Sequence, residues 1–259
     1  MLATKSDPKL SNKLQEKALA LFVSDVHLSD ALPRTTDYFL RFLSEQARNT
    51  ERLYLLGDLF EYWAGDDDGE NSYNQEIIGA LRALNDFGVK IFWIAGNRDF
   101  LIGSHFAQSA GVELLNDPTE LRIGECHLLI SHGDALCTDD TSYMTFRAMV
   151  RQTEWQTAFL AKPLAERKAI ILGMRKASNT EQQNKSMAIM DVNPDAVMSL
   201  CEQYPGATLI HGHTHRNAIH QEAHGLRYVL PDWDCDHHQN KRGGWLRLDS
   251  QGKLEFIYI

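Results

Sequence analysis

The chain has 259 residues, with 26 Lys and Arg against 35 Asp and Glu, and 43% of its residues are hydrophobic. This composition is typical of a soluble globular protein, and the net charge of −9 argues against nucleic acid as a partner, which would need a basic face. No apolar run approaches the roughly 18 residues of a membrane span, and the polar N-terminus does not resemble a signal peptide. The four cysteines form no C-x-x-C pair, so we expect no disulfide framework and a cytoplasmic location.

Short apolar runs alternate with amphipathic stretches along the first half of the chain. Strands are predicted at 19–24, 53–56 and 89–95, with helices at about 35–47 and 75–86 between them. Such strand–helix–strand units predict right-handed crossovers and a mainly parallel sheet. Further strands are predicted at 126–131, 208–211, 226–229, 245–248 and 254–258. Short turns separate the last three, so we expect them to pair as antiparallel neighbours.

Residues 139–192 break this rhythm, because their pattern is helical and contains no convincing strand. Asn193-Pro194 then has the sequence of a helix N-cap and first turn. We interpret 139–192 as a helical insertion between two core strands. Between positions 147 and 185 eight basic residues stand against three acidic ones, interleaved with apolar side chains such as Trp155, Phe159 and Leu160. The apolar stripe could be core or could line a partly exposed groove, and the basic excess could face anionic lipid or a phosphorylated substrate.

Side chains with metal-ligand chemistry follow five of the predicted strands, and they are Asp25, His27, Asp58, Asn97, His132, His213 and His215. The carboxyl ends of parallel strands meet at one edge of a sheet, so these loops can converge. Seven ligands suit two ions that share one carboxylate, an arrangement that clamps a phosphoryl group. Imidazole, carboxylate and amide ligands without thiolates favour Mn²⁺, Fe²⁺ or Zn²⁺. Any one motif could be a simple turn, and the histidines between 211 and 238 could be a solvated surface, but five motifs in this order favour the two-metal interpretation.

The order D-x-H, G-D, G-N-x-D, H-G-D and G-H-T-H resembles the calcineurin-like metallophosphoesterases. Longer segments resemble the UDP-2,3-diacylglucosamine hydrolase family of lipid A biosynthesis, namely FVSDVHLSD, LYLLGDLFEYWAGDDD, GNRDFLIG, ISHGDALCTDD, NKSMAIMDVN and IHGHTHRN. The resemblance covers about residues 20–220, and residues 1–17 look like an N-terminal extension. It implies one four-layer αββα metallophosphoesterase sandwich over residues 1–259, with 139–192 as a helical lid.

The resemblance also implies an activity and a set of roles. The reaction would be hydrolysis of the pyrophosphate bond of UDP-2,3-diacylglucosamine, with a dimetal-activated water attacking the α-phosphorus to give UMP and 2,3-diacylglucosamine 1-phosphate (lipid X). One Mn²⁺ would be held by Asp25, His27, Asp58 and His215, and the other by Asp58, Asn97, His132 and His213. Catalytic roles would fall to Asp58, Arg98 and His213. Substrate contacts would come from Asn97, Arg98, Asp140, Ser178, Lys185 and His213, with Gln182 standing where many relatives have Asn. The enzyme would lie peripherally on the cytoplasmic face of the inner membrane, with no required protein partner.

Arg98 distinguishes this chain from many calcineurin-like phosphoesterases, which have histidine at this position of the G-N-x-D motif. That histidine is placed to protonate or stabilise a leaving alkoxide. An arginine is not deprotonated in proteins, so Arg98 cannot be a general acid, but it can stabilise charge on a phosphate. We therefore expect a leaving group that departs without protonation, such as a phosphate from a pyrophosphate. The alternative is that Arg98 is a surface charge beside the motif.

Two rival functions share these motifs. A nucleotide-sugar or ADP-ribose-type pyrophosphatase would use the same site but would not need the basic and apolar insertion. A metal-poor scaffold would keep the fold as a binding surface, although the presence of all seven ligands argues against it. Asp99 and Asp134 could orient ligand histidines or loop backbone, or they could be turn residues.

Overall fold

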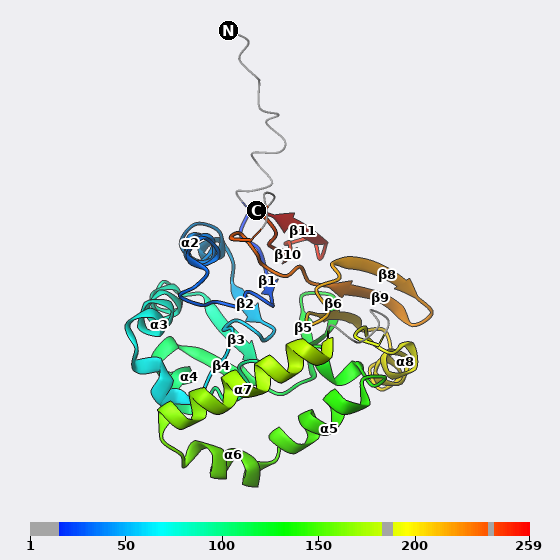
Figure 1. Ribbon diagram of the computed structural model, residues 1–259. Helices are drawn as coiled ribbons and strands as arrows, with labels where there is room; N and C mark the ends of the chain where they lie inside the picture. The colour runs from blue at the N-terminus through cyan, green and yellow to red at the C-terminus, as the bar shows by residue number, and fades with distance from the viewer. Residues whose placement is uncertain (1–15, 183–188, 238–240) are drawn as a thin grey trace.

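A computed structural model describes residues 16–182, 189–237 and 241–259. Two β-sheets pack face to face with helices outside them (Figure 1). The first sheet has the strand order β11-β10-β1-β2-β3-β4, with β1 to β4 parallel, and the second has the order β5-β6-β7-β9-β8. The strands are β1 (Ala20–Val23), β2 (Arg52–Leu55), β3 (Lys90–Ile94), β4 (Val112–Leu115), β5 (Thr119–Ile123), β6 (Cys126–Ser131), β7 (Thr208–His211), β8 (Ala218–Glu222), β9 (Gly225–Val229), β10 (Gly244–Leu248) and β11 (Leu254–Tyr258).

Alternation of side chains along the strands divides the apolar residues between layers. In β1, Phe22 belongs to the core between the two sheets, whereas Leu21 and Val23 belong to the core between the first sheet and its helices. A third cluster contains Leu209 of β7 and Val197 of the helix that covers the second sheet. Because both faces of the central strands are buried, these strands have nearly continuous apolar sequences. The expected four-layer αββα sandwich is confirmed.

Helices α2 (Pro33–Arg41), α3 (Ser72–Asp86) and α4 (Ser104–Ala110) cover the first sheet, and α8 (Pro194–Glu202) covers the second. The predicted N-cap of α8 is confirmed, because the Asn193 side chain accepts a hydrogen bond from the backbone N–H of Ala196 at 3.0 Å. The helix expected over 35–47 is shorter, since α2 ends at Arg41. The chain continues there as a π-helical turn, η1 (Phe42–Gln46), and a 3₁₀ turn, η2 (Ala47–Asn49), and further 3₁₀ turns are η3 (Asp66–Glu70) and η4 (Asp134–Leu136).

Four elements were not predicted, and each depends on tertiary contacts. Strands β4, β5 and β8 lie at sheet edges, where an exposed face admits polar residues such as Glu113 and Glu120 and weakens the apolar pattern. Helix α4 begins without a local cap. The carboxylate of Asp66, about 40 residues earlier, accepts hydrogen bonds from three backbone N–H groups at its start, those of Gly103, His105 and Phe106.

One pairing prediction is wrong. Strand β9 does not join the last two strands, because it pairs in parallel with β7 and antiparallel with β8 in the second sheet. The unpredicted β8 provides that antiparallel partner. The expected antiparallel pair of β10 and β11 is confirmed.

The described residues between 139 and 192 form helices and loops only. Helices α5 (Thr141–Val150), α6 (Thr153–Leu160) and α7 (Leu164–Gln182) lie together at the end of the molecule opposite β10 and β11 (Figure 1). None of the helices in the described part of the chain has the length and hydrophobicity of a membrane span.

Candidate metal centre

Five loops bring the seven predicted ligands to one place between the sheets. In the first sheet, the loops after β1, β2 and β3 carry Asp25 and His27, then Asp58, then Asn97. In the second sheet, the loops after β6 and β7 carry His132, then His213 and His215. All five strands run into the site at their carboxyl ends, as parallel pairing in each sheet requires.

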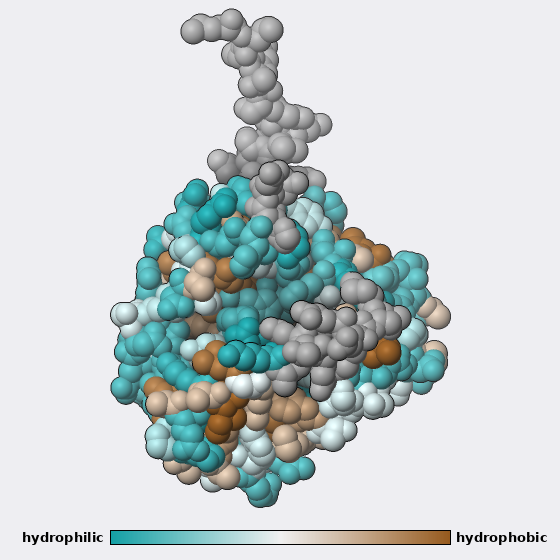
Figure 2. All heavy atoms as spheres, in the orientation of Figure 1, coloured by the Kyte–Doolittle hydropathy of each residue, from teal (hydrophilic) through white to brown (hydrophobic). Residues whose placement is uncertain are grey.

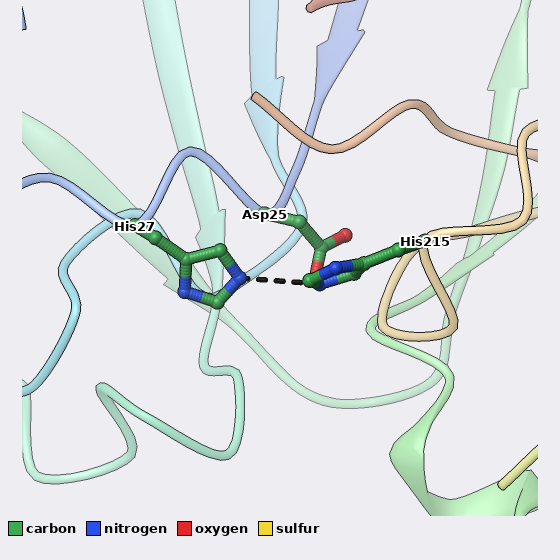
Figure 3. Close-up of side chains that lie close together, drawn as sticks. All are labelled: Asp25, His27 and His215. Carbon is green, nitrogen blue, oxygen red and sulfur yellow. Dashed lines mark hydrogen bonds and ion pairs between the residues drawn. The ribbon is translucent and has the colours of Figure 1, made fainter. Parts of the chain in front are cut away.

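The first cluster consists of Asp25, His27 and His215 (Figure 3). The Nε2 atoms of His27 and His215 lie 3.2 Å apart, and His215 Nε2 lies 3.4 Å from Asp25 Oδ1. Asp25 is completely buried, and its second oxygen accepts hydrogen bonds from the Ser24 hydroxyl and the backbone N–H of His213. The backbone of the G-H-T-H loop is thereby held against the end of β1.

The second cluster consists of Asp58, His132 and His213, with Asn97 between the two histidines. Asn97 Oδ1 lies 3.0 Å from His132 Nε2 and 2.9 Å from His213 Nδ1. His132 Nδ1 lies 2.8 Å from the carbonyl oxygen of Leu56, a partner that requires this nitrogen to carry the proton. The opposite nitrogen of a neutral His132 is therefore available as a ligand.

The backbone at these side chains is strained in a consistent way. Five of the seven predicted ligands have positive φ angles of 52° to 68°, namely Asp25, His27, Asp58, His213 and His215. No other non-glycine residue that the structure describes has a positive φ angle. Such conformations cost on the order of 1–3 kcal/mol each and gather at functional sites. Two glycines make room for the carboxylates, because a Cβ at Gly96 would overlap Asp58 Oδ1 and a Cβ at Gly212 would overlap Asp25 Oδ2. The loops are built to present these side chains closely.

The electrostatics of the clusters suit a cation. Burial lowers the pKa of His27 and of His213 to about 4, so both imidazoles are neutral with free lone pairs. Burial also opposes the charged form of His132, but Asp58 and Asp134 outweigh it and raise the pKa of His132 to about 9. Burial likewise acts against the Asp25 carboxylate, yet His215 holds the pKa of Asp25 well below its usual range. A cation bound here would replace protons among these groups.

Each cluster offers one carboxylate and two imidazoles, with ligand atoms within 4.8 Å of one another. This donor set fits Mn²⁺, Fe²⁺ or Zn²⁺. The two clusters are the candidate metal-binding sites in the part of the chain that the structure describes.

Two aspartates beside the ligands have structural contacts. Asp99 is buried and accepts hydrogen bonds from the backbone N–H groups of Gly96 and Leu59, so it joins the loops after β2 and β3. Its burial, together with the neighbouring Asp58, raises the pKa of Asp99 to about 6. Asp134 accepts from the Tyr143 hydroxyl at 2.6 Å and from Arg147 Nε at 2.8 Å. It therefore anchors α5 rather than a ligand histidine.

A cavity of about 530 Å³ opens above the clusters. One part of its wall is polar and includes His27, Asp58, Asn97, Arg98 and His213. The other part is apolar and includes Phe100, Trp155, Phe159, Ile171 and Met174. The candidate metal clusters and the apolar side of the insertion thus line the same open cavity.

The predicted substrate-contact residues fall into three groups. Asn97, Arg98, Asp140 and His213 line the cavity, and Asp140 also caps α5 by accepting from the N–H of Tyr143. Ser178 and Gln182 belong to the last turns of α7, where side chains lie outside the described part of the chain. Lys185 lies outside the described residues.

Sequence reasoning missed Glu61, Arg175 and Tyr143, all of which line the cavity. The Tyr143 ring stacks on His213 with centroids 5.9 Å apart. Glu61 stands three residues after Asp58, inside the segment LYLLGDLFEYWAGDDD, and its charge is the only signal that the sequence gives. The alternatives for the apolar stripe both occur, since Phe159 is buried, Trp155 is half-buried and Leu160 is exposed.

The fold and the paired clusters define a class of protein. A family model described as calcineurin-like phosphoesterase matches residues 19–217, and the chain belongs to this family. The family consists of metal-dependent hydrolases of phosphate esters and pyrophosphates, so the protein is a metallophosphoesterase.

The curated relatives carry a more specific name than the family model does. A UDP-2,3-diacylglucosamine hydrolase of Aromatoleum aromaticum is 46% identical over 239 residues, covering 90% of this chain and 94% of the relative. A protein of the same name from Enterobacter sp. is 46% identical over 236 residues, covering 90% of this chain and 95% of the relative. Another from Escherichia coli is 46% identical over 220 residues, covering 83% of this chain and 91% of the relative. Among solved structures, one described as a novel archaeal phosphodiesterase has a TM-score of 0.46 and 13% identity, covering 93% of this chain and 99% of that one.

Proposed function

We propose that this protein hydrolyses the pyrophosphate bond of UDP-2,3-diacylglucosamine to UMP and 2,3-diacylglucosamine 1-phosphate. The observation that carries this proposal is the shared cavity, which has the metal clusters and Arg98 on one side and apolar side chains of the insertion on the other. A nucleotide-only pyrophosphatase would need the polar side alone. The names of the curated relatives support the same substrate.

We further propose that the clusters hold two Mn²⁺ ions, with Fe²⁺ or Zn²⁺ as alternatives. Asp25, His27 and His215 would bind one ion, Asn97, His132 and His213 the other, and Asp58 would bridge both. Two such ions, when bound, supply an acidified water as nucleophile for the α-phosphorus and charge to hold the phosphoryl oxygens.

The protein's own groups orient the pyrophosphate and stabilise its developing charge. The backbone N–H of Arg98 donates to Asp58 Oδ1 at 2.8 Å, and the Arg98 side chain lines the cavity next to the candidate metal clusters. There it can stabilise charge on the leaving phosphate, which needs no proton to depart. We propose that Asn97, His213, Asp140, Ser178, Gln182 and Lys185 contact the substrate, as the resemblance implies.

We propose that α5, α6 and α7 act as a lid that covers the acyl chains. Trp155 and Phe159 stack with centroids 4.8 Å apart and face the cavity together with Ile171 and Met174. Each acyl methylene buried against such a surface contributes about 0.8 kcal/mol. Long acyl chains could therefore supply most of the binding free energy.

Comparison of two substrates tests this function. The protein reconstituted with Mn²⁺ should turn over UDP-2,3-diacylglucosamine with a far higher kcat/KM than UDP-glucosamine without acyl chains. Replacing Trp155 by serine should raise KM for the diacylated substrate by about 10-fold, because a large apolar contact is lost, and should leave the non-acylated substrate unchanged. Phe87→Ser, on an exposed side chain at the end of α3, is the matched control. Equal kcat/KM for both substrates would contradict the lipid assignment and favour a nucleotide-sugar pyrophosphatase.

The basic excess of the insertion is largely used within the protein. At least six of its eight basic side chains contact carboxylates or carbonyls, in the pairs Arg147–Asp134, Arg151–Gly96 O, Lys162–Glu166, Arg167–Asp67, Lys168–Asp68 and Arg175–Glu61. Five of these join the insertion to the core. The charge pattern that suggested a lipid-facing patch therefore serves mainly to attach the helices.

Exposed apolar side chains on the same helices offer another route to a membrane. Met149, Leu160 and Leu172 are 42%, 40% and 51% exposed, and Figure 2 shows hydrophobic surface around these helices. We propose that this surface rests on the cytoplasmic face of the inner membrane, so the association is peripheral.

The membrane proposal predicts binding that depends on apolar contact. Wild-type protein should co-sediment with phosphatidylethanolamine–phosphatidylglycerol vesicles equally at low and high salt, because screening affects charge contacts and not apolar ones. Leu160→Ser with Leu172→Ser should reduce the bound fraction several-fold, whereas Met198→Ser, an equally exposed change on α8, should not. Binding that disappears in salt, or that survives the double substitution, would refute this surface.

A further inference from the structure

The carboxylate of Glu61 lies between the metal clusters and the insertion. Its Oε2 atom is 3.0 Å from Nδ1 of His27, on the side of the ring away from the first cluster. Its Oε1 atom faces two guanidinium groups, with Arg98 Nη1 at 3.7 Å and Arg175 Nη2 in direct contact. One side chain thus touches a candidate metal ligand, the candidate charge-stabilising arginine and a lid helix.

The contact with His27 has a consequence for metal binding. The contact is a close approach of the carboxylate to Nδ1 without the angle of a hydrogen bond, and the negative charge there favours the tautomer that carries its proton on Nδ1. Nε2 of His27, which faces His215, is then left with its lone pair directed into the first cluster. Such carboxylate–histidine pairs orient the ring and increase its strength as a ligand.

The contact with Arg175 joins Glu61 to helix α7 of the insertion. Lys168 and Arg175 are seven residues apart on α7 and so share a helix face, which bears on the core segment 61–68. Lys168 pairs with the buried Asp68, away from the metal clusters, whereas Arg175 lines the cavity and pairs with Glu61. Arg167 of the same helix pairs with Asp67, so at least three side chains attach α7 to the core, and Arg175 among them contacts the partner of a candidate metal ligand.

We propose that Glu61 is a positioning residue that couples the docking of α7 to the first metal cluster. Its carboxylate holds His27 ready to bind the cation and holds Arg175 down over the cavity at the same time. Cation binding and closure of α7 then favour each other, since a coupling between two events acts equally in both directions. The inference rests on the proposed function insofar as His27 is taken as a metal ligand.

Mn²⁺ titration calorimetry on the metal-stripped full chain tests the coupling without reference to turnover. Glu61→Gln keeps the size of the side chain but removes its charge, and should weaken Mn²⁺ binding at one of two sites by about 10- to 100-fold, the usual effect of losing a ligand's partner. Arg175→Gln should weaken the same site by a smaller factor. The double variant should be no weaker than Glu61→Gln alone, because both substitutions remove one shared connection.

Hydrogen exchange along residues 164–176 supplies the second measurement. In the wild type, Mn²⁺ should slow exchange in this part of α7, and in both Glu61→Gln and Arg175→Gln that slowing should vanish. Lys168→Gln is the matched control, since it removes an ion pair of the same helix and should keep both wild-type Mn²⁺ affinity and the Mn²⁺-dependent protection. Unchanged Mn²⁺ affinity in Glu61→Gln, or additive losses in the double variant, would overturn the proposal. A wild-type chain that binds no Mn²⁺ would instead refute the metal centre itself.

Discussion

Replacing Asp58 by alanine should lower pyrophosphate turnover by about 10³-fold or more and reduce the Mn²⁺ content at both positions. Asp58 is 2% exposed, lies 3.7 Å from His132 through its Oδ1 atom, and also influences the charge state of His27 in the other cluster. A carboxylate shared by two ions cannot be lost without weakening both, and both ions are needed to hold the phosphoryl group. Elemental analysis of the purified variant beside its turnover checks the prediction.

Two further variants separate bridging from simple loss of structure. Asp58→Asn keeps an oxygen that can accept from the N–H of Arg98, so it preserves the loop while removing the charge. It should still lose metal at both positions. His27→Ala should weaken one position only, because His27 belongs to the first cluster alone. Full metal content in Asp58→Ala would show that Asp58 is not the bridge.

Arg98→Ala should reduce turnover of the pyrophosphate substrate by about 10²-fold while leaving the metal content unchanged. The loss of one charge-stabilising group at a transition state has this order of magnitude. Arg98 contacts the clusters through its backbone N–H, which alanine retains, so the ligand loops should stay in place. Single-turnover rates measured with saturating substrate separate this effect from weaker binding.

Arg98→Lys and Arg122→Ala are the informative controls for that experiment. Lysine keeps the positive charge but loses the planar fork of donors, so part of the rate should return. Arg122 lies on the surface with a side chain 70% exposed, and its removal should have no effect. Wild-type turnover in Arg98→Ala would mean that Arg98 is a surface charge beside the motif.

The site could be predicted from the sequence more completely than the fold around it. The seven candidate ligands follow directly from the ends of buried strands, and the apolar runs that mark those strands, such as 19–24, are unambiguous because both faces are covered. The rule that parallel strands end at one edge applies within each sheet. Asp25 and His213 are 188 positions apart and follow strands of different sheets, so the packing of the two sheets is also needed to bring them together.

The remainder depends on partners that no local pattern reveals. Glu61 carries an ordinary charge in the sequence, and its proposed role depends on contacts with His27 and with Arg175, which lies 114 residues later in the chain. Strand β8 has a half-exposed sequence that becomes a strand because β9 lies beside it. The sequence leaves open whether the basic residues of the insertion face anionic lipid or a phosphorylated substrate, because the carboxylates that several of them pair with lie in distant segments.

The distribution of the ligands between the sheets has a consequence for the stability of the whole sandwich. Each cluster draws side chains from both sheets, with Asp25 and Asp58 following strands of the first and His215 and His132 following strands of the second. An ion in either cluster would cross-link the two sheets and close chain loops as long as 190 residues between its ligands. At a free ion concentration 100 times the dissociation constant, each bound ion would add about 2.7 kcal/mol to the free energy of unfolding. The ions proposed for catalysis would thus also stabilise the packing of one sheet against the other.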